Sequence, residues 1–390
     1  MPMHSGRLIF AQLMEFLPAG EFNRCVARYR GDFRTRRFSC WDQFLCMAFA
    51  QLTYRESLRD IQTCLRSIQS KLYHAGFRGR MARNTLAKAN ENRNWRIWAD
   101  LAGALIARAR VLYADEPNAL NLPQAVYAFD STTIDLCLTL FPWAQFRRRK
   151  SAVKLHTLLD LRGNIPCFVH VSGGAMADVR SLDLLPIEAG ALYVMDRGYI
   201  DFARLYRFTQ GLAFFITRAK SDLDFSRRSY QDIDKSAGLR SDQVIVLCGP
   251  KTADRYPVPL RRIAYYAADI DQRFVFLTNN FILPALTIAQ LYKCRWQVEL
   301  FFKWIKQYLR IKGFYGTSPN AVKTQVWIAL CVYVLVALVK KELKIDRSMA
   351  EILQILSIGP FENTPILQAF SQHSITMEND AIHNRLPLFN

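Results

Sequence analysis

The stretch TIAQLYKCRWQVELFFKWIKQYL, from Thr287 to Leu309, is the most informative part of this 390-residue chain. Its polar residues recur at helical spacing: Arg295, Glu299 and Lys306 follow Tyr292 by three, seven and fourteen positions. At 3.6 residues per turn, these four side chains project from one face within roughly 60°. Another face carries the apolar residues Cys294, Val298, Phe301, Phe302, Ile305 and Leu309. The stretch predicts one amphipathic helix that buries an apolar stripe and presents a Tyr/Arg/Glu/Lys stripe.

A carboxylate flanked by cations on a helix is more often an ordinary solvated ion-pair face, so the pattern needs support elsewhere. Two aspartates upstream give that support. Asp130 stands in AVYAFDSTTIDL and Asp196 in LYVMDRGYIDF, each directly after a short apolar, strand-like run. Either aspartate alone would be read as a turn or cap residue. Together, these two contexts ahead of the helix make its Tyr/Arg/Glu/Lys spacing specific.

In this combination the sequence resembles the bacterial insertion-sequence transposases of the DDE group that carry a Tyr-Arg-Glu-Lys signature, the IS-four family. The resemblance spans about residues 121 to 345. It implies that Asp130, Asp196 and Glu299 are catalytic and bind two Mg²⁺ ions, for which Mn²⁺ can substitute. It also implies cut-and-paste DNA transposition by a homodimer on paired DNA ends, with a hairpin intermediate in some relatives. Three acids converging without metal are expected to titrate at raised, coupled pKa values.

The resemblance further implies DNA contacts for the other signature residues. Tyr292, Arg295 and Lys306 are expected to contact the transposon end, with Arg295 gripping phosphate through two nitrogens. Trp296 is a candidate for stacking on a flipped base. Between the first two strand-like runs of the core, FRRRKSAVK predicts a cationic loop on the DNA backbone beside the site. Its basic residues are Arg147, Arg148, Arg149, Lys150 and Lys154.

The composition favours a polyanionic partner. Lys and Arg number 52 against 33 Asp and Glu, a net charge of +19 with a pI near 9.7. Double-stranded DNA is the expected partner. A membrane surface is the other polyanion, but the longest apolar run, Val326 to Val339, is too short to span a bilayer comfortably and predicts a buried helix. Nine scattered cysteines, without a Cys-x-x-Cys pair, predict reduced core thiols in a cytoplasm. With DNA as the expected partner, the resemblance implies a bacterial protein associated with the nucleoid.

The periodicity and composition of the sequence divide the chain into five expected segments. Residues 1–120 are expected to form an all-helical DNA-binding domain, and 121–220 and 285–345 the two parts of an α/β core. Residues 221–284 read as a β-rich insertion and 346–390 as a helical tail. From the resemblance, the core is expected to be ribonuclease-H-like, with a mixed five-stranded sheet and helices.

The first of these segments is rich in arginine. One cluster comprises Arg24, Arg28, Arg30, Arg34, Arg36 and Arg37. The region around Gly76 to Asn84 has the outline of a helix-turn-helix that would bring Arg83, Asn84, Lys88 and Asn90 near base edges. Basic clusters on helices more often only solvate a fold, but the overall charge favours DNA binding here.

Two alternative functions remain open from the sequence. One is a ribonuclease-H-like nuclease or resolvase that cuts DNA without strand transfer. The other is a catalytically inactive DNA-binding relative, against which the presence of Asp130, Asp196 and Glu299 argues.

Overall fold

The computed structural model describes residues 7–79, 81–118, 120–148, 150–308 and 313–371. These residues form two compact units, each assembled from segments far apart in the sequence. Within the described residues, the helical unit holds 7–114, 134–153 and 302–371, and the sheet unit holds 115–133 and 154–301. The chain is therefore a mixed α/β protein with a helical N-terminal region, as the sequence predicts.

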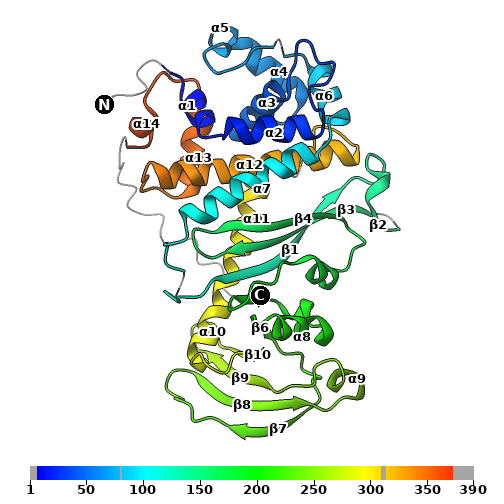
Figure 1. Cartoon of the computed structure of the whole chain (residues 1–390), viewed down its shortest axis with the longest axis vertical. Helices are drawn as coiled ribbons and strands as arrows, with labels where there is room; N and C mark the ends of the chain where they lie inside the picture. Colours follow the sequence, from blue (N-terminus) through cyan, green and yellow to red (C-terminus); the bar gives the residue numbers. More distant parts are fainter. Residues whose placement is uncertain (1–6, 80, 119, 149, 309–312, 372–390) are drawn as a thin grey trace. The chain divides into compact units, whose positions relative to one another are not determined.

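The helical unit is built mainly from helices near the two ends of the chain (Figure 1). They are α1 (Ile9–Glu15), α2 (Ala19–Arg28), α3 (Cys40–Leu52), α4 (Leu58–Ser67), α5 (Gln69–Leu72), α6 (Arg83–Asn92), α7 (Arg96–Leu112), α12 (Pro319–Glu342), α13 (Met349–Ile358) and α14 (Ile366–Ser371). The same unit holds the 3₁₀ turn η1 (Pro142–Ala144) and strand β2 (Gln145–Arg147), which pairs with the first residues of β3 (Lys150–Asp160). Of the helices, α2 was not anticipated from the sequence.

Helix α12 is the core of the helical unit. It packs against α7, α3 and α6, and its residues from Val326 to Val339 are almost all buried. By length and composition it is the one helix among the described residues that could cross a membrane, yet 89% of its apolar window is buried inside the protein. This burial accounts for its hydrophobicity, because each fully buried Val or Leu contributes roughly 1.5–3 kcal/mol to folding. The expectation of a buried helix is confirmed.

The sheet unit is organised around a large mixed sheet, drawn in green in Figure 1. Its strands are β1 (Val126–Leu136), β3, β4 (Ile165–Gly173), β5 (Leu192–Met195), β6 (Phe214–Arg218), β7 (Phe225–Tyr230), β8 (Leu239–Leu247), β9 (Leu260–Ala267) and β10 (Gln272–Thr278). The order is β3-β1-β5-β6-β10-β9-β8-β7, with β4 paired to β3. Strands β1, β5 and β6 are parallel, whereas β10 runs antiparallel to β6. The expected β-rich insertion therefore extends the same sheet.

Side-chain alternation along β5 explains how both faces of this sheet are covered. Tyr193 and Met195 belong to an apolar cluster with Leu205 and Phe208 of α8 (Phe202–Gln210). Leu192 and Val194 point to the opposite face because successive strand residues alternate. Helix α10 (Ala285–Cys294) packs against β5, β6, β8 and β9.

The helix expected from Thr287 to Leu309 is present as two helices that meet at one residue. Helix α10 ends at Cys294 and α11 (Trp296–Tyr308) begins after Arg295. At the junction the backbone N–H of Arg295 donates to Tyr292 O and that of Val298 to Arg295 O, both at 3.1 Å. These i→i−3 bonds tighten the turn relative to an α-helix. The predicted apolar stripe is buried at Val298, Phe301, Phe302 and Ile305, while Leu309 lies outside the described residues.

The cysteines are all free thiols, but the expectation that they are core residues holds only in part. Cys25, Cys40, Cys46 and Cys331 are buried, whereas two lie exposed on the surface. The exposed pair is Cys137 and Cys248.

Candidate active site

The two aspartates lie side by side at the end of paired parallel strands. In the β1–β5 register, Val126 pairs with Leu192 and Phe129 with Met195. Asp130 and Asp196 are the next residues on each strand, so their Cα atoms are about 5 Å apart, the spacing of neighbouring strands. Strand residues 126–129 and 192–195 are fully buried, which fixes the position of both backbones. The expectation that the aspartates reach the same sheet edge is confirmed.

Glu299 joins this edge through a guanidinium. Arg295 Nη1 lies 2.9 Å from Asp130 Oδ2, and Arg295 Nη2 lies 2.6 Å from Glu299 Oε1. Only 12% of the Arg295 side chain is exposed, against 19% for Asp130 and 32% for Glu299. Arg295 therefore bridges two carboxylates in a largely dry environment, where charge-assisted hydrogen bonds are strong.

The acid cluster perturbs the titration of its members. Burial raises the pKa of Asp130 to about 6, Arg295 opposes this shift, and the charges of Glu299 and Asp196 add to it. Burial alone would lower the pKa of Arg295, but the neighbouring Tyr292, Asp130 and Glu299 outweigh it and raise that pKa. Burial is thus the main cause of the raised pKa of Asp130, and the convergence of the acids expected from the sequence is a smaller one.

Two buried tyrosines hold the aspartates. The Tyr292 hydroxyl donates to Asp196 Oδ1 at 3.0 Å, and its ring packs on Phe276 with centroids 4.9 Å apart. The Tyr199 hydroxyl lies 3.5 Å from Asp130 Oδ1 and its ring packs on Phe129. Both tyrosines are at least 95% buried, and burial raises the pKa of each, so the hydroxyls remain protonated donors. Tyr199 was not singled out from the sequence, although it follows Asp196 within the Asp-Arg-Gly-Tyr motif.

A second series of polar contacts begins at the residue after Asp130. Ser131 Oγ donates to Asp178 Oδ1 at 2.8 Å, and Lys154 Nζ lies 3.0 Å from the same oxygen. Lys154 also donates to the Met176 carbonyl at 2.9 Å, which ties the segment carrying Asp178 to β3. This arrangement positions a fourth carboxylate next to Asp130 through Ser131.

His156 lies beside the Lys154–Asp178 pair but carries no charge at neutral pH. Its side chain is completely buried, and burial lowers its pKa from 6.5 to about 4. The imidazole Nε2 is 2.9 Å from Ser172 Oγ, whereas Nδ1 approaches Asp178 only to 3.9 Å. That approach is therefore a contact of a neutral ring and not an ion pair.

The donor set suits a hard divalent cation. Carboxylate oxygens are the ligands that Mg²⁺ and Mn²⁺ prefer, and a positive charge beside Asp130 would relieve the conditions that raise its pKa. Within the described part of the chain, no three acidic, His or Cys side chains are already arranged around a common metal position. Arg295 takes up the interaction of two of the three carboxylates. The residues thus fit divalent ions in chemistry, with Arg295 needing to give up at least one contact.

Three of the side chains expected to contact DNA are engaged inside the protein instead. Tyr292 is 4% exposed and donates to Asp196, and Arg295 is held by Asp130 and Glu299. Lys154 is 8% exposed because β3 continues through it, so the expected loop is a buried strand there. Each of these side chains already has an acceptor within the protein, so a direct phosphate contact would require it to give that acceptor up, and the contact stays a prediction.

The remaining candidates lie on accessible surfaces or outside the description. Arg148 and Lys150 are exposed in the helical unit, at the β2–β3 hairpin. Lys306 and Trp296 are half-buried on α11. Arg149 lies outside the described residues, and of Arg147 only the backbone is described.

Helix α6 carries two of the expected DNA contacts on its surface. Arg83 and Lys88 are exposed, together with Asn84, while the helix packs against α3, α4 and α12. Asn90 does not belong to this surface: it is 2% exposed and its Oδ1 accepts from Gln43 Nε2 at 2.8 Å. The expectation of a base contact by Asn90 is therefore wrong.

Comparison with known proteins gives two family matches along the chain. Residues 121–335 match the model described as "Transposase DDE domain", and residues 5–78 match a "Domain of unknown function (DUF4372)". The first match includes Asp130, Asp196 and Glu299.

Three bacterial proteins named as transposases are similar to the chain. The transposase y4zB of Sinorhizobium fredii is 32% identical over 276 residues, which is 70% of this chain and 75% of the relative. A transposase for insertion sequence element IS5377 of Geobacillus stearothermophilus is 29% identical over 56% of this chain and 57% of its own. One for element IS4SA of Synechocystis is 21% identical over 86% and 93%. Among solved structures, the piggyBac transposase synaptic complex with hairpin DNA aligns with a TM-score of 0.48 and 8% identity, over 93% of this chain and 81% of that chain.

Proposed function

The chain belongs to the family of transposases with a DDE domain, and we propose that Asp130, Asp196 and Glu299 are its catalytic carboxylates. It is a DDE transposase of the insertion-sequence type, which binds DNA and depends on divalent metal. One observation carries the assignment of the three residues. Asp130 and Asp196 directly follow the last paired residues of the adjacent parallel strands β1 and β5, and Glu299 shares the Arg295 guanidinium with Asp130.

We further propose that the centre of the sheet is a ribonuclease-H-like core. The order β4-β3-β1-β5-β6, with β1, β5 and β6 parallel, supports this reading. The segment boundaries 1–120, 121–220, 221–284, 285–345 and 346–390 are part of the same proposal, as is membership of the Tyr-Arg-Glu-Lys type of insertion-sequence transposase. The approach of Tyr292, Arg295 and Glu299 to the two aspartates supports that membership.

The proposed reaction consists of two phosphoryl transfers. In the first, a water oxygen attacks the phosphorus at the transposon end, the P–O bond to the 3′ oxygen breaks, and that oxygen leaves as a 3′-hydroxyl. In the second, the 3′-hydroxyl attacks a target phosphodiester and displaces the target's own 3′ oxygen, so one phosphodiester replaces another. Divalent ions bound by Asp130, Asp196 and Glu299 supply charge neutralisation at the attacking and leaving oxygens. We propose Mg²⁺ as the ion, with Mn²⁺ as a substitute.

The chain's own residues have separable parts in this proposal. Tyr292 orients the carboxylate of Asp196, and Tyr199 lies against that of Asp130, so both acids present fixed oxygens to the site. Arg295 balances Asp130 and Glu299 in the metal-free enzyme. If divalent ions were held by the acids, the guanidinium of Arg295 would be free to bind the phosphates that enter beside them. This order reconciles its buried position with the phosphate contact that the resemblance implies.

The partner assignments follow from the same function. We propose that the DNA comprises transposon ends and target, that the active form is a homodimer on paired ends, and that the protein acts in the bacterial cytoplasm at the nucleoid. The net charge of +19 supports the DNA partner. Exposed Arg83, Lys88, Arg148 and Lys150 are the candidate phosphate contacts.

The test replaces each carboxylate by alanine and measures strand cleavage and strand transfer in Mg²⁺ on DNA carrying the element's ends. Asp130→Ala, Asp196→Ala and Glu299→Ala are each expected to lower cleavage by ~10³-fold or more while DNA affinity changes little. Asp183→Ala is the matched control, because Asp183 is an aspartate of the same unit that pairs with Arg204 on the surface. Near-normal cleavage by any one variant would remove that residue from the site.

A pre-cut end distinguishes the enzymatic alternative. A nuclease or resolvase would cleave intact ends but fail to join a pre-cut 3′-hydroxyl to target DNA. An inactive DNA-binding relative would bind the ends and do neither.

A further inference from the structure

The segment between α2 and α3 adopts an unusual backbone. Arg30 has φ 51° and Arg34 has φ 57°, which is the left-handed region that residues other than glycine seldom occupy. Phe33 lies between them in the sequence. Backbone conformations of this kind persist where the surrounding structure imposes them, and they cluster at functional sites.

Partly buried hydrogen bonds hold this segment in place. Arg93 donates to the carbonyl oxygens of Ser39, at 2.9 Å, and of Phe38. Asp32 Oδ1 accepts from the Cys40 N–H at 2.6 Å. The carboxylate of Asp42, which is 2% exposed, links the end of the segment to a neighbouring turn. It accepts from the N–H groups of Ser39, Arg78 and Gly79 at 2.9–3.0 Å.

Gly79 shows how closely that turn approaches the segment. A Cβ atom at this position would clash with the Arg37 carbonyl oxygen, so only glycine fits without a shift. Burial would raise the pKa of Asp42, but the hydrogen bonds from Arg78, Ser39 and Gly79 outweigh it and lower that pKa. Asp42 therefore stays ionised, and the segment is preformed.

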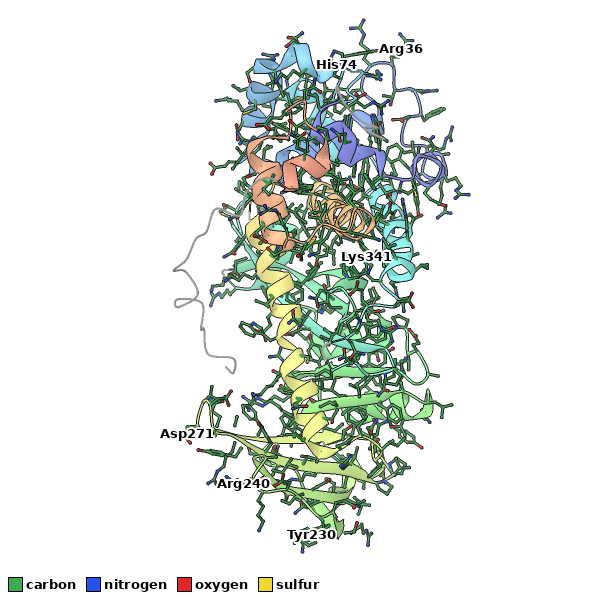
Figure 2. All side chains as sticks on the ribbon, turned by 90° about the vertical axis from the view of Figure 1, so that its left-hand side faces the viewer. Arg36, His74, Tyr230, Arg240, Asp271 and Lys341 are labelled. Atoms are coloured by element: carbon green, nitrogen blue, oxygen red, sulfur yellow. The ribbon has the colours of Figure 1, made fainter. Side chains whose placement is uncertain are left out.

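What the segment presents to solvent is an aromatic ring between two guanidinium groups. Phe33 is 56% exposed, and the Cζ atoms of Arg30 and Arg34 lie 4.1 and 5.2 Å from its ring centroid. Arg36 and Arg37 are exposed beside them, and Figure 2 shows Arg36 projecting away from the ribbon of the helical unit.

The charges of this segment are not neutralised within the protein. In the part of the chain that the structure describes, Arg30, Arg34, Arg36 and Arg37 form no ion pair with a carboxylate, although neighbouring arginines of α2 do. Arg24 pairs with Glu21, and Arg28 lies 2.5 Å from Asp100. The cluster read from the sequence as a single group of six therefore contains two structural arginines and four that are available to an external anion.

The surface around these four arginines is hollowed. One cavity of about 740 Å³ is lined by Arg36, Arg37 and Arg78, and another of about 540 Å³ by Arg30, Phe33 and Lys88. Both share Thr35, Arg37, Phe38 and Thr85, so they lie on either side of the same segment. An elongated polyanion fits such a paired, cationic surface better than a single small anion does.

We propose that residues 29–39 form a DNA contact site in which Phe33 packs against a base while Arg30, Arg34, Arg36 and Arg37 bind the flanking phosphates. This inference rests on the proposed function, and it assigns a role to the region that matches the domain of unknown function. Guanidinium groups bind phosphate through two nitrogens, and aromatic rings stack on bases without sequence preference. An exposed phenylalanine flanked by two unpaired arginines combines both contacts in one preformed segment.

The test measures binding of the full chain to a fluorescent mixed-sequence duplex, and to one of its single strands, over a range of salt. Phe33→Ala is expected to weaken binding about 10-fold with an unchanged salt slope, because the lost contact is uncharged. Phe33→Tyr keeps an aromatic ring and is expected to keep the affinity. Arg36→Ala with Arg37→Ala is expected to reduce the slope of log K against log salt by roughly 1.8, since each phosphate contact contributes about 0.9.

The control is Arg24→Ala with Arg28→Ala, which removes the same charge from the ion-paired residues of the cluster. It is expected to change the slope by much less than the Arg36/Arg37 double variant does. Equal slopes for the two double variants, or wild-type affinity for Phe33→Ala, would overturn the proposal. The proposal would also be overturned if Phe33→Ala or the Arg36/Arg37 double variant kept its DNA affinity but lost binding to vesicles of phosphatidylglycerol and phosphatidylcholine. That result would assign the segment to a membrane surface. Cleavage of DNA by the wild type distinguishes these outcomes from failure of the proposed function. If the proposed function is wrong, the wild type does not cleave DNA, whatever the Phe33 variants show.

Discussion

Removal of Arg295 is the most informative perturbation of the active site. In the structure its guanidinium is 12% exposed and contacts Asp130 at 2.9 Å and Glu299 at 2.6 Å. Truncating one member of a buried ion pair typically costs 3–5 kcal/mol, because the partner charge stays buried without compensation. Since Glu299 is about a third exposed, we expect Arg295→Ala to lose about 3 kcal/mol of unfolding free energy in metal-free buffer, measured by chemical denaturation.

The same substitution should change the response to metal. In the wild type a cation must compete with Arg295 for Asp130 and Glu299, whereas in Arg295→Ala these carboxylates are available. Saturating Mn²⁺ is therefore expected to stabilise the variant more than the wild type. An ion at 100 times its Kd adds about 2.7 kcal/mol, which would restore most of the loss. Thermal unfolding with EDTA and with Mn²⁺ measures both quantities without requiring activity.

Arg204→Ala serves as the control, because Arg204 also binds two aspartates, Asp183 and Asp201, but its side chain is 25% exposed against 12% for Arg295. It is expected to cost no more than about 1 kcal/mol and to leave the metal response unchanged. If Arg295→Ala is as stable as the wild type in EDTA, or gains no more from Mn²⁺ than the wild type does, the role of Arg295 as the internal counter-charge is refuted.

Three further predictions concern residues around the acids. Asp178→Ala and Ser131→Ala are each expected to lower single-turnover cleavage about 10-fold without changing DNA affinity. The double variant is expected to lose no more than either, because both substitutions remove the same Ser131–Asp178 hydrogen bond next to Asp130. The pKa of His156 is lowered from 6.5 to about 4, so the unfolded chain takes up its proton first as pH falls. The free energy of unfolding is therefore intact above pH 6.5 and declines by about 3 kcal/mol toward pH 4, and His156→Gln should flatten that decline in urea titrations. Lys154→Ala is expected to leave DNA affinity unchanged while lowering stability, whereas exposed Arg148→Ala should weaken DNA binding, as measured by fluorescence anisotropy.

The parts of the fold that were predictable are those with strong local periodicity. The apolar run of α12, the buried strand before Asp196 and the stripe at Val298 to Ile305 each carry a strong local pattern. Strand β7 was missed because its side chains are mostly exposed and show no alternation. The break at Arg295 was missed because the sequence around it contains neither glycine nor proline.

The composition of the site was predictable from the sequence, but not its internal pairing. Helical spacing places Arg295 one turn before Glu299, so their ion pair is a local feature. The contact between Arg295 and Asp130 joins residues 165 positions apart and depends on how β1 and the α10–α11 junction meet. Lys154 shows the same limit. Its neighbours suggested a cationic loop, yet an acceptor 24 residues further along, Asp178, makes it a buried partner.

A basic residue among acids can serve two purposes that a sequence does not separate. Carboxylates that converge without a cation repel one another, and the charges of Glu299 and Asp196 add to the burial that raises the pKa of Asp130. An internal guanidinium reduces that repulsion. It must also be able to leave, and a long, flexible side chain at a helix junction is better suited to that than one held rigidly within a strand. Arg295, at the junction of α10 and α11, meets both requirements. We propose that charge balance and phosphate binding are successive roles of Arg295, and the metal dependence of Arg295→Ala stability distinguishes this sequence of roles from a purely structural ion pair.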